Sequence, residues 1–575
     1  MIISIGQTAI RLKQTLTSHA IICTLGSLMI LSLILPTVFP VYFRADDVVY
    51  LDWARTHAWV DCFRPSVASL FGMFRPVQNI AWWSLYHLAG LNPYPYHVAV
   101  LFSYLVSLAV YLAFIKTAFS TRVALASMAT YGVCFYFLTY IVFWFSDLTY
   151  TLELMFANGA LWFFALAIKL NMRRYLAGTF ALFCIAVAAK EPAAFIIPLV
   201  CACLLFVKWE HLDHLMRRRS AFMACLMLVA GISWILVNPA VQSRQGIPLG
   251  QGASDVIAFL MHRWAFYAGS LTAFPAILVL AAALYPLLQK VLSRSTVDPS
   301  RSQWIAAGVS VVLTLLLKTV PDLAMLILML ALPLLILSRH PSGVGAIWAA
   351  PAILGIMTID YMVQTYLVEA SFGLALICGT SIVPLVDRII PHVAMRSGRR
   401  KQILAMCACA ILALFMGMTP FLSGKLHALR ILSANRQNFA SAISYLTQAR
   451  ELIPIPLLII DYSDMGLVYE RNILPLGDEE KALRQKTMTS QTLEVFLAPA
   501  SIPVHNLEWW QTHTEIKEAA LLTLNVQEEE FLNGTMPRKR LLREWSHGET
   551  HSRLYRIDRD LADPSHSESN DSKKR

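Results

Sequence analysis

Residues Phe43 to His97 read FRADDVVYLDWARTHAWVDCFRPSVASLFGMFRPVQNIAWWSLYHLAGLNPYPYH and separate two long apolar runs. Two adjacent acids, Asp46 and Asp47, stand at the exit of the first run. Carboxylates are costly to take out of water at a membrane boundary, so an acidic pair at this place suggests a site. We therefore expect residues 43–96 to form an external loop that carries functional groups.

The composition around this stretch is that of a membrane protein. Of the 575 residues, 57% are hydrophobic and only 14% are charged, and the mean hydropathy is +0.57. These values predict an α-helical polytopic membrane protein surrounded by membrane lipids. The net charge of +11 does not indicate a nucleic-acid partner, because the basic residues fall in short loops where membrane orientation explains them.

Runs of about 20 apolar residues are long enough to cross a bilayer as a helix. The sequence contains about thirteen such runs, which predicts about thirteen transmembrane helices. We place them at 18–42, 97–116, 122–145, 148–169, 174–190, 191–207, 220–238, 263–289, 303–318, 321–338, 343–361, 366–386 and 402–422.

After His97, lysine and arginine are concentrated in alternate loops and are few in the opposite ones, which predicts the orientation of the chain. These loops carry Lys116, Arg122, Lys169, Arg173, Arg174, Lys208, Arg217, Arg218, Arg219, Lys290, Arg294, Arg301, Arg339, Arg388, Arg396, Arg399, Arg400 and Lys401. By the positive-inside rule these loops and the N-terminus are cytoplasmic, and the loop over 43–96 is extracytoplasmic. Few sequons and mostly intramembrane cysteines favour a bacterial inner membrane.

Three regions follow from the change in composition along the chain. Residues 1–422 are the predicted transmembrane domain. Residues 423–557 mix polar and apolar positions, with a helical pattern at 434–452 and a strand-like run at 456–460, and predict a small mixed α/β domain. An odd number of spans would place this domain on the extracytoplasmic side of the membrane. Residues 558–575 are polar and without periodicity, which is typical of a disordered tail.

Several ionisable residues stand at the predicted outer ends of spans. Such groups usually face a bundle interior or a water-filled cavity and pair with one another. The sequence therefore predicts one charged cavity that opens outward, although each group alone could mark a span end. The set comprises Asp147, Glu153, Lys190, Glu191, Arg244, Arg263, Lys318, Asp322, Asp360 and Glu369.

The loop over 43–96 resembles the first external loop of the GT-C glycosyltransferases, most closely the protein O-mannosyltransferase-like branch. The resemblance is carried by the acidic pair, by Arg75-Pro76 followed by Asn79, and by Gly90-Leu91-Asn92-Pro93 leading to Tyr96-His97. A second likeness is Lys190-Glu191-Pro192, and a weaker one begins at Tyr366. The resemblance implies a GT-C fold and transfer of a sugar from a polyprenyl-phosphate donor.

Candidate site residues are assigned on this basis. The resemblance favours Asp46 as the catalytic base, with Asp47 as its neighbour or alternative. Arg75 matches phosphate oxygens with a planar fork of donors, and Lys190, held by Glu191, is expected at the same phosphate. Further pocket candidates are Asn79, His97, Asp147 and Tyr366. No metal-ligand spacing is present, and a metal requirement does not follow from the sequence.

The predicted function is inverting transfer of a sugar from a polyprenyl-phosphate donor to an envelope glycan, lipid or protein on the outer face of the membrane. One alternative is a transporter or flippase for a lipid-linked glycan, for which matching halves with broken helices would be expected. Another is an inactive, glycan-binding relative. Thr365 and Ala370 stand where the branch has Arg and Pro, which keeps that alternative open.

Overall fold

The computed structural model describes residues 46–65, 74–134, 145–238, 253–271, 277–293, 299–357 and 367–394, parts of 441–448, and five strands between 457 and 558. The chain divides into two compact units. One consists of Val49–Ser423 with Leu474–Glu480, and the other of Met1–Val48, Gly424–Ile473 and Lys481–Arg575. The predicted spans at 18–42 and 402–422 and the predicted tail lie outside the described residues.

The predicted first external loop contains helices with clear local signals. They are α2 (Asp46–Thr56), the 3₁₀ helix η1 (Trp59–Phe63) and α3 (Pro76–Ala89). Pro76 opens α3, a position where the missing N–H is not needed. Gly90 ends it with φ 57°, a left-handed conformation that suits glycine. The side chain of Asn92 then accepts a hydrogen bond from the Tyr94 N–H and caps the next helix.

Among the residues that the structure describes, five helices are long and apolar enough to cross a membrane. They run over Pro93–Ala118, Phe145–Leu170, Ala193–His211, His214–Val237 and Leu367–Pro384. The first is α4 (Pro93–Ala118), and the others contain η5 (Phe145–Asp147) with α6 (Leu148–Leu170), α8 (Ala193–Lys208) with η6 (Trp209–His211), α9 (His214–Val237) and the start of α16 (Leu367–Ala394). The prediction of a helical membrane protein is therefore confirmed, whereas the number thirteen stays a prediction.

The structure describes seven further helices of this unit beyond α2 and α3. They are α5 (Thr121–Cys134), α7 (Arg174–Ala189), α11 (Ala253–Leu271), α12 (Leu278–Leu292), α13 (Pro299–Leu317), α14 (Pro321–Leu337) and α15 (Ser342–Ile356). The single span predicted at 263–289 is wrong, because that range is divided between α11 and α12.

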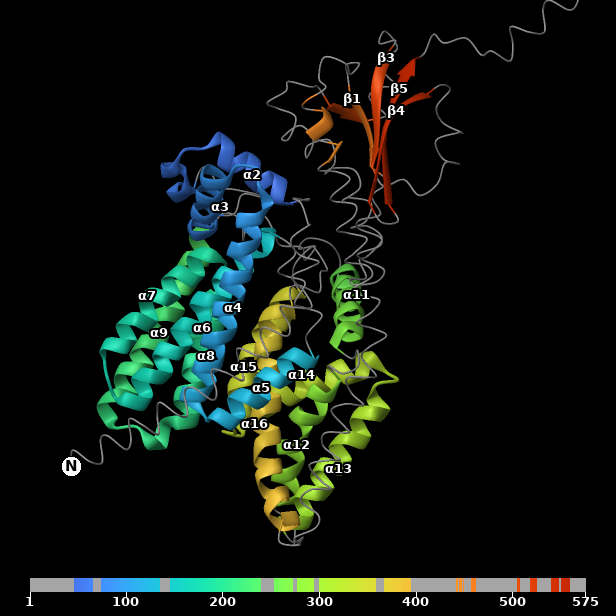
Figure 1. Cartoon of the computed structure of the whole chain (residues 1–575). Helices are drawn as coiled ribbons and strands as arrows, with labels where there is room; N and C mark the ends of the chain where they lie inside the picture. Colours follow the sequence, from blue (N-terminus) through green and yellow to red (C-terminus); the bar gives the residue numbers. More distant parts are fainter. Residues whose placement is uncertain are drawn as a thin grey trace, which may run out of the picture. The chain divides into compact units, whose positions relative to one another are not determined.

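Close packing joins the helices on which the site is built. In Figure 1, α4 runs beside α6, and the two are linked where the Ser103 hydroxyl lies 2.6 Å from that of Thr151. The Tyr111 hydroxyl donates to the Phe372 carbonyl at 2.6 Å and so ties α4 to α16. Gly345 of α15 faces the backbone of Gly373 of α16, and a Cβ at either position would clash with the other backbone. Small residues therefore let these two helices approach closely.

The second unit contains one five-stranded sheet with strand order β2-β1-β3-β5-β4. Its strands are β1 (Leu457–Asp461), β2 (Val504–Asn506), β3 (Glu518–Leu524), β4 (Lys539–His547) and β5 (Thr550–Asp558). Strand β1 pairs in parallel with β2 and β3, and β5 pairs antiparallel with β3 and β4. The strand predicted at 456–460 is confirmed, and the described residues of 441–448 are helical as expected.

Candidate active site

Arg75 and Glu191 form a largely buried ion pair between α3 and the turn that joins α7 to α8. Arg75 Nε donates to Glu191 Oε1 at 2.9 Å, and Arg75 Nη2 donates to Glu191 Oε2 at 2.6 Å. The side chains are only 10% and 17% exposed. This parallel arrangement of two hydrogen bonds is the strongest form of an arginine–carboxylate pair, and it fixes the plane of the guanidinium group.

The pair also controls the charge of both groups. Burial alone would lower the pKa of Arg75, but the adjacent carboxylate raises it above its ordinary value. Burial alone would raise the pKa of Glu191, but the guanidinium lowers it below its ordinary value. Both groups are therefore charged near neutral pH, because each stabilises the charge of the other.

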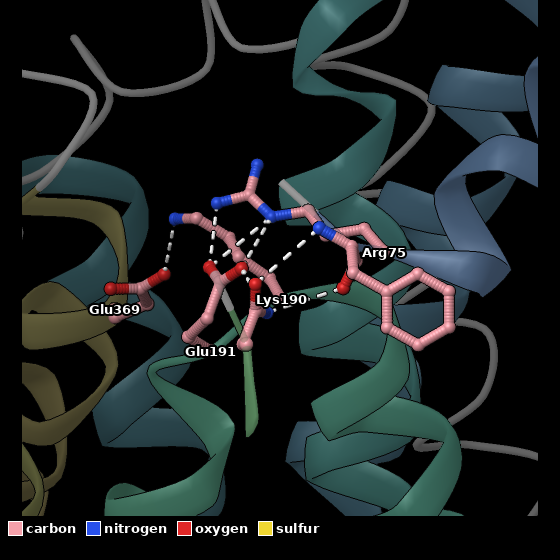
Figure 2. A network of polar contacts seen from close by, with 6 residues as sticks. Arg75, Lys190, Glu191 and Glu369 are labelled. Atoms are coloured by element: carbon pink, nitrogen blue, oxygen red, sulfur yellow. Dashed lines mark hydrogen bonds and ion pairs between the residues drawn. The ribbon is translucent and has the colours of Figure 1, made fainter. Parts of the chain in front are cut away.

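Lys190 pairs with a different acid. Its Nζ donates to Oε1 of Glu369, near the start of α16, at 2.9 Å, and both side chains are buried. The same Nζ lies 2.9 Å from the centre of the Tyr150 ring on α6, a cation–π contact. Figure 2 shows this pair together with the Arg75–Glu191 pair.

The expectation that Glu191 holds Lys190 stays a prediction, because the described hydrogen bonds join Lys190 to Glu369 and Glu191 to Arg75, and the backbone gives the reason for this arrangement. Lys190 ends α7 in an extended conformation, with φ −163° and ψ 145°. Adjacent side chains on extended backbone point to opposite sides. Lys190 therefore reaches α16 while Glu191 reaches α3, and the two neighbours anchor separate elements.

A third acid and a capping amide complete the charged cluster. Glu153 of α6 is buried within electrostatic range of Lys190 and Glu369. Asn238, at the end of α9, donates from Nδ2 to the Phe74 carbonyl at 3.2 Å and to Glu191 Oε1 at 3.4 Å. The cluster formed by Arg75, Glu153, Lys190, Glu191 and Glu369, called the charged cluster below, thus holds two cations and three acids.

The predicted aspartate pair lies at the start of α2. The structure does not describe the side chain of Asp46, whereas the side chain of Asp47 is fully buried. Asp47 precedes Tyr50 by three residues, so the two lie on one face of the helix. Tyr50 stacks on Trp82 of α3 at 5.1 Å between ring centres and lies within electrostatic range of Arg75.

The other predicted pocket residues lie on different elements, and one of them is outside the described residues. Asn79 lies in the first turn of α3, His97 lies in the first two turns of α4, and Asp147 precedes α6 in η5; all three are buried. The His97 ring packs on Phe145, with ring centres 4.3 Å apart. Tyr366 lies outside the described residues.

Only some of the ionisable residues that were predicted to line one charged cavity lie close together. Glu153, Lys190, Glu191 and Glu369 are brought together, but Lys318 and Asp322 are exposed. Arg263 is buried against the Phe259 ring of its own helix, 3.3 Å from the ring centre. Arg244 and Asp360 lie outside the described residues. The position of a charge near a span end therefore did not by itself identify the cluster members.

Two contributors were missed by the sequence analysis. Tyr150 follows Asp147 by three residues and is the aromatic partner of Lys190. Asn238 ends a predicted span, and a buried amide at a helix end is a signal that could have been used. Within the described ranges, no group of three histidine, cysteine or acidic side chains is arranged to hold a metal ion.

The loops rich in Lys and Arg lie at the opposite ends of the same helices. The charged cluster lies where α6 begins, where α7 passes into α8 and where α9 ends. Helix α6 ends, α7 begins, and α8 passes into α9 beside Arg173, Arg174 and Arg217. Successive helices joined by short turns run in alternate directions, so the cluster and the basic loops are separated by the length of a span.

Comparison with known proteins gives weak likeness only. No family model matches the chain, and no curated protein matches it. Among solved structures it is similar to ArnT from Cupriavidus metallidurans bound to undecaprenyl phosphate, with 12% identity over 95% of this chain and 99% of that chain and a TM-score of 0.41. It is also similar to the archaeal oligosaccharyltransferase AglB from Archaeoglobus fulgidus, in complex with an inhibitory peptide and a dolichol-phosphate, with 11% identity, 88% and 69% coverage and a TM-score of 0.43. Such likeness establishes neither fold nor function.

Proposed function

We propose that this protein is a membrane glycosyltransferase of the GT-C type that moves a sugar from a polyprenyl-phosphate donor to an envelope acceptor on the outer face, with inversion. The observation that carries the proposal is the pair of buried, fixed cations, Arg75 and Lys190, at the end of the bundle opposite the basic loops. By the positive-inside rule that end is extracytoplasmic.

Arg75 has donors left for a phosphate. Its contacts with Glu191 use Nε and Nη2, and Nη1 donates to no residue in the described part of the chain. A guanidinium held by one carboxylate presents its remaining N–H groups in a fixed direction, which suits the recognition of phosphate oxygens. The ion pair thus orients the cation without occupying all of its donors.

The chemistry assigned to these residues is direct displacement at the anomeric carbon. A carboxylate of the Asp46–Asp47 pair takes the proton of the acceptor hydroxyl, and the acceptor oxygen bonds to the anomeric carbon. The bond from that carbon to the phosphate oxygen breaks, and its electron pair leaves with the phosphate. Arg75 and Lys190 stabilise the negative charge that develops there. Attack from the side opposite the leaving group inverts the anomeric centre.

The carrier class agrees with the lipids in the two similar structures, undecaprenyl phosphate in one and dolichol phosphate in the other. Because both TM-scores are low, the proposal rests on the charged residues of this chain. The mannosyltransferase-like branch and the acceptor stay predictions.

The test is sugar transfer by the purified full chain in lipid nanodiscs. Undecaprenyl-phosphate mannose, glucose and galactose, each radiolabelled in the sugar, are supplied with an envelope fraction as acceptor. Wild type is compared with Asp46→Asn, Asp47→Asn and Arg75→Ala. The matched control is Asp52→Asn on the same helix, because Asp52 is an exposed acid that pairs only locally with Arg55 at 2.7 Å.

We expect transfer by wild type and the control, loss of transfer in one aspartate variant, and retained binding of undecaprenyl phosphate in that variant. Absence of transfer from all three donors, despite lipid binding by wild type, would overturn the enzyme assignment and favour a transporter or a binding protein. Normal transfer by both aspartate variants would remove the acidic pair from the mechanism.

A further inference from the structure

One face of α3 carries three buried polar side chains directly after Arg75. Gln78 and Trp82 are completely buried, and Asn79 is 1% exposed. Residues spaced by three and four positions lie on the same face of a helix, so Trp82 stands beside both amides. The three side chains form what we call the amide face.

Within the part of the chain that the structure describes, the polar atoms of the amide face have no protein partners. The side-chain oxygen and nitrogen of Gln78, those of Asn79, and Nε1 of Trp82 make no hydrogen bond to any residue of the described chain. A buried polar group without a partner is strongly destabilising, and native proteins rarely contain several together. Five such atoms on one helix face therefore point to a bound polar ligand.

Neighbouring side chains continue the same environment. Tyr50 stacks on Trp82. The Tyr96 ring also packs against Trp82, with ring centres 5.5 Å apart. Aromatic rings beside amide groups form a surface that suits a ring carrying several hydroxyl groups.

The amide face is adjacent to the proposed phosphate position. The backbone N–H of Asn79 donates to the Arg75 carbonyl at 2.9 Å, so the two residues are one helical turn apart. One turn advances by about 5.4 Å. That is close to the spacing between a phosphate and the centre of a sugar ring attached to it.

We propose that Gln78, Asn79 and Trp82 bind the hydroxyl groups of a sugar ring, a role that rests on the function proposed above. Each amide offers donors and acceptors, the indole offers a donor, and sugar hydroxyls both donate and accept. A donor sugar beside its phosphate and a glycan acceptor offer the same recognised chemistry, a polyhydroxylated ring, and the test below distinguishes them.

Binding to the full chain in nanodiscs tests the proposal with three probes. They are undecaprenyl phosphate, undecaprenyl-phosphate mannose, and octyl mannoside, which has the ring without the phosphate. The variants are Gln78→Leu, Asn79→Leu and Trp82→Phe, the last of which removes only the indole N–H donor and keeps an aromatic ring. The matched control is Thr314→Val on α13, which deletes an equally buried, unpartnered hydroxyl elsewhere in the unit.

We expect each amide variant to bind undecaprenyl-phosphate mannose about tenfold more weakly than wild type, the usual value of one good hydrogen bond. The affinity of the same variants for undecaprenyl phosphate should stay within twofold of the wild-type value. A loss confined to octyl mannoside assigns the ring to the acceptor and still supports the proposal. Unchanged affinity for both mannosides in the variants overturns it, while the function proposed above stands if transfer continues.

Thermal unfolding separates a binding role from a structural one. Replacing an unpartnered buried amide by leucine removes a desolvated polar group, so the ligand-free variants should melt at the wild-type temperature or a few degrees above it. Melting well below wild type and below Thr314→Val would mean that the amides support the fold, and would overturn the proposal. If wild type binds neither lipid but binds octyl mannoside through the amide face, the phosphate function fails and the sugar site remains.

Discussion

The Nζ atom of Lys190 lies 2.9 Å from Oε1 of Glu369, a residue 179 positions later in the chain. This contact ties the α7–α8 turn to the start of α16 in the buried interior. A lysine with a buried carboxylate partner keeps its charge in place, whereas a lysine without one is costly to bury. The pair therefore both connects distant elements and holds a cation where a phosphate is expected.

The first prediction concerns the uneven cost of breaking this pair. Glu369→Gln leaves Lys190 with Glu153 and the Tyr150 ring nearby. Lys190→Met leaves two buried acids without that cation. Removing one partner of a buried pair typically costs about 3–5 kcal/mol, and we expect Lys190→Met to lie at the upper end and Glu369→Gln below it. Unfolding in an SDS titration, followed by tryptophan fluorescence, measures the difference, and equal losses would contradict a role for Glu153.

The second prediction concerns the shape of the Arg75 side chain. Arg75→Lys keeps the positive charge but loses the fork that contacts both oxygens of Glu191 and leaves Nη1 for phosphate. We expect kcat/KM for transfer from an undecaprenyl-phosphate sugar to fall about 10- to 100-fold, in line with the loss of about 1.4–2.7 kcal/mol of transition-state binding. Arg55→Lys is the control, because Arg55 is exposed and pairs with Asp52 on its own helix. Full activity of Arg75→Lys would mean that charge alone suffices.

The sequence predicted the members of the site better than their contacts. Arg75, Lys190 and Glu191 could be proposed because the segments that carry them resemble those of the GT-C glycosyltransferases and because ionisable groups in an apolar chain usually pair or serve a site. Which acid meets which base depends on the extended backbone at Lys190 and on the packing of α16, and neither is visible in local sequence. The buried side-chain amide of Gln78 and the indole N–H of Trp82 were missed for the same reason. The burial of α3 depends on elements from distant parts of the chain.

Helix boundaries show a related limit. The single span predicted at 263–289 failed because average hydropathy over a long apolar stretch does not show where one helix ends and the next begins. The span predicted at 97–116 likewise starts four residues after the observed start of α4 at Pro93. Composition therefore located apolar helices without defining their ends.

The third prediction tests the orientation with single cysteines. Arg64→Cys places a thiol at a side chain that is 60% exposed in the first loop, and Arg173→Cys places one at an exposed position between α6 and α7. With the first loop outside, a membrane-impermeant maleimide should label the first variant in intact cells and the second only after permeabilisation. The wild-type chain gives the background; Cys62 should add little to it, because its thiol is buried and burial raises its pKa to about 11. The reverse labelling pattern would invert the orientation and place the charged cluster on the cytoplasmic side.

The fourth prediction concerns acid stability and involves the turn between α14 and α15. The Ser342 N–H donates to His340 Nδ1 at 3.2 Å, and burial lowers the pKa of His340 to about 4 from the usual 6.5. Above pH 6.5 both the folded and unfolded forms of this residue are neutral. Between pH 6.5 and 4 the unfolded chain binds a proton that the folded chain does not, so the free energy of unfolding falls as the pH falls, by at most about 3 kcal/mol. His340→Asn keeps an acceptor for the Ser342 N–H but cannot titrate, so its unfolding free energy should fall less than that of wild type between pH 7.5 and 4.5. SDS titration at the two pH values measures both changes, and an equal decrease in wild type and variant would show that His340 is not the residue responsible.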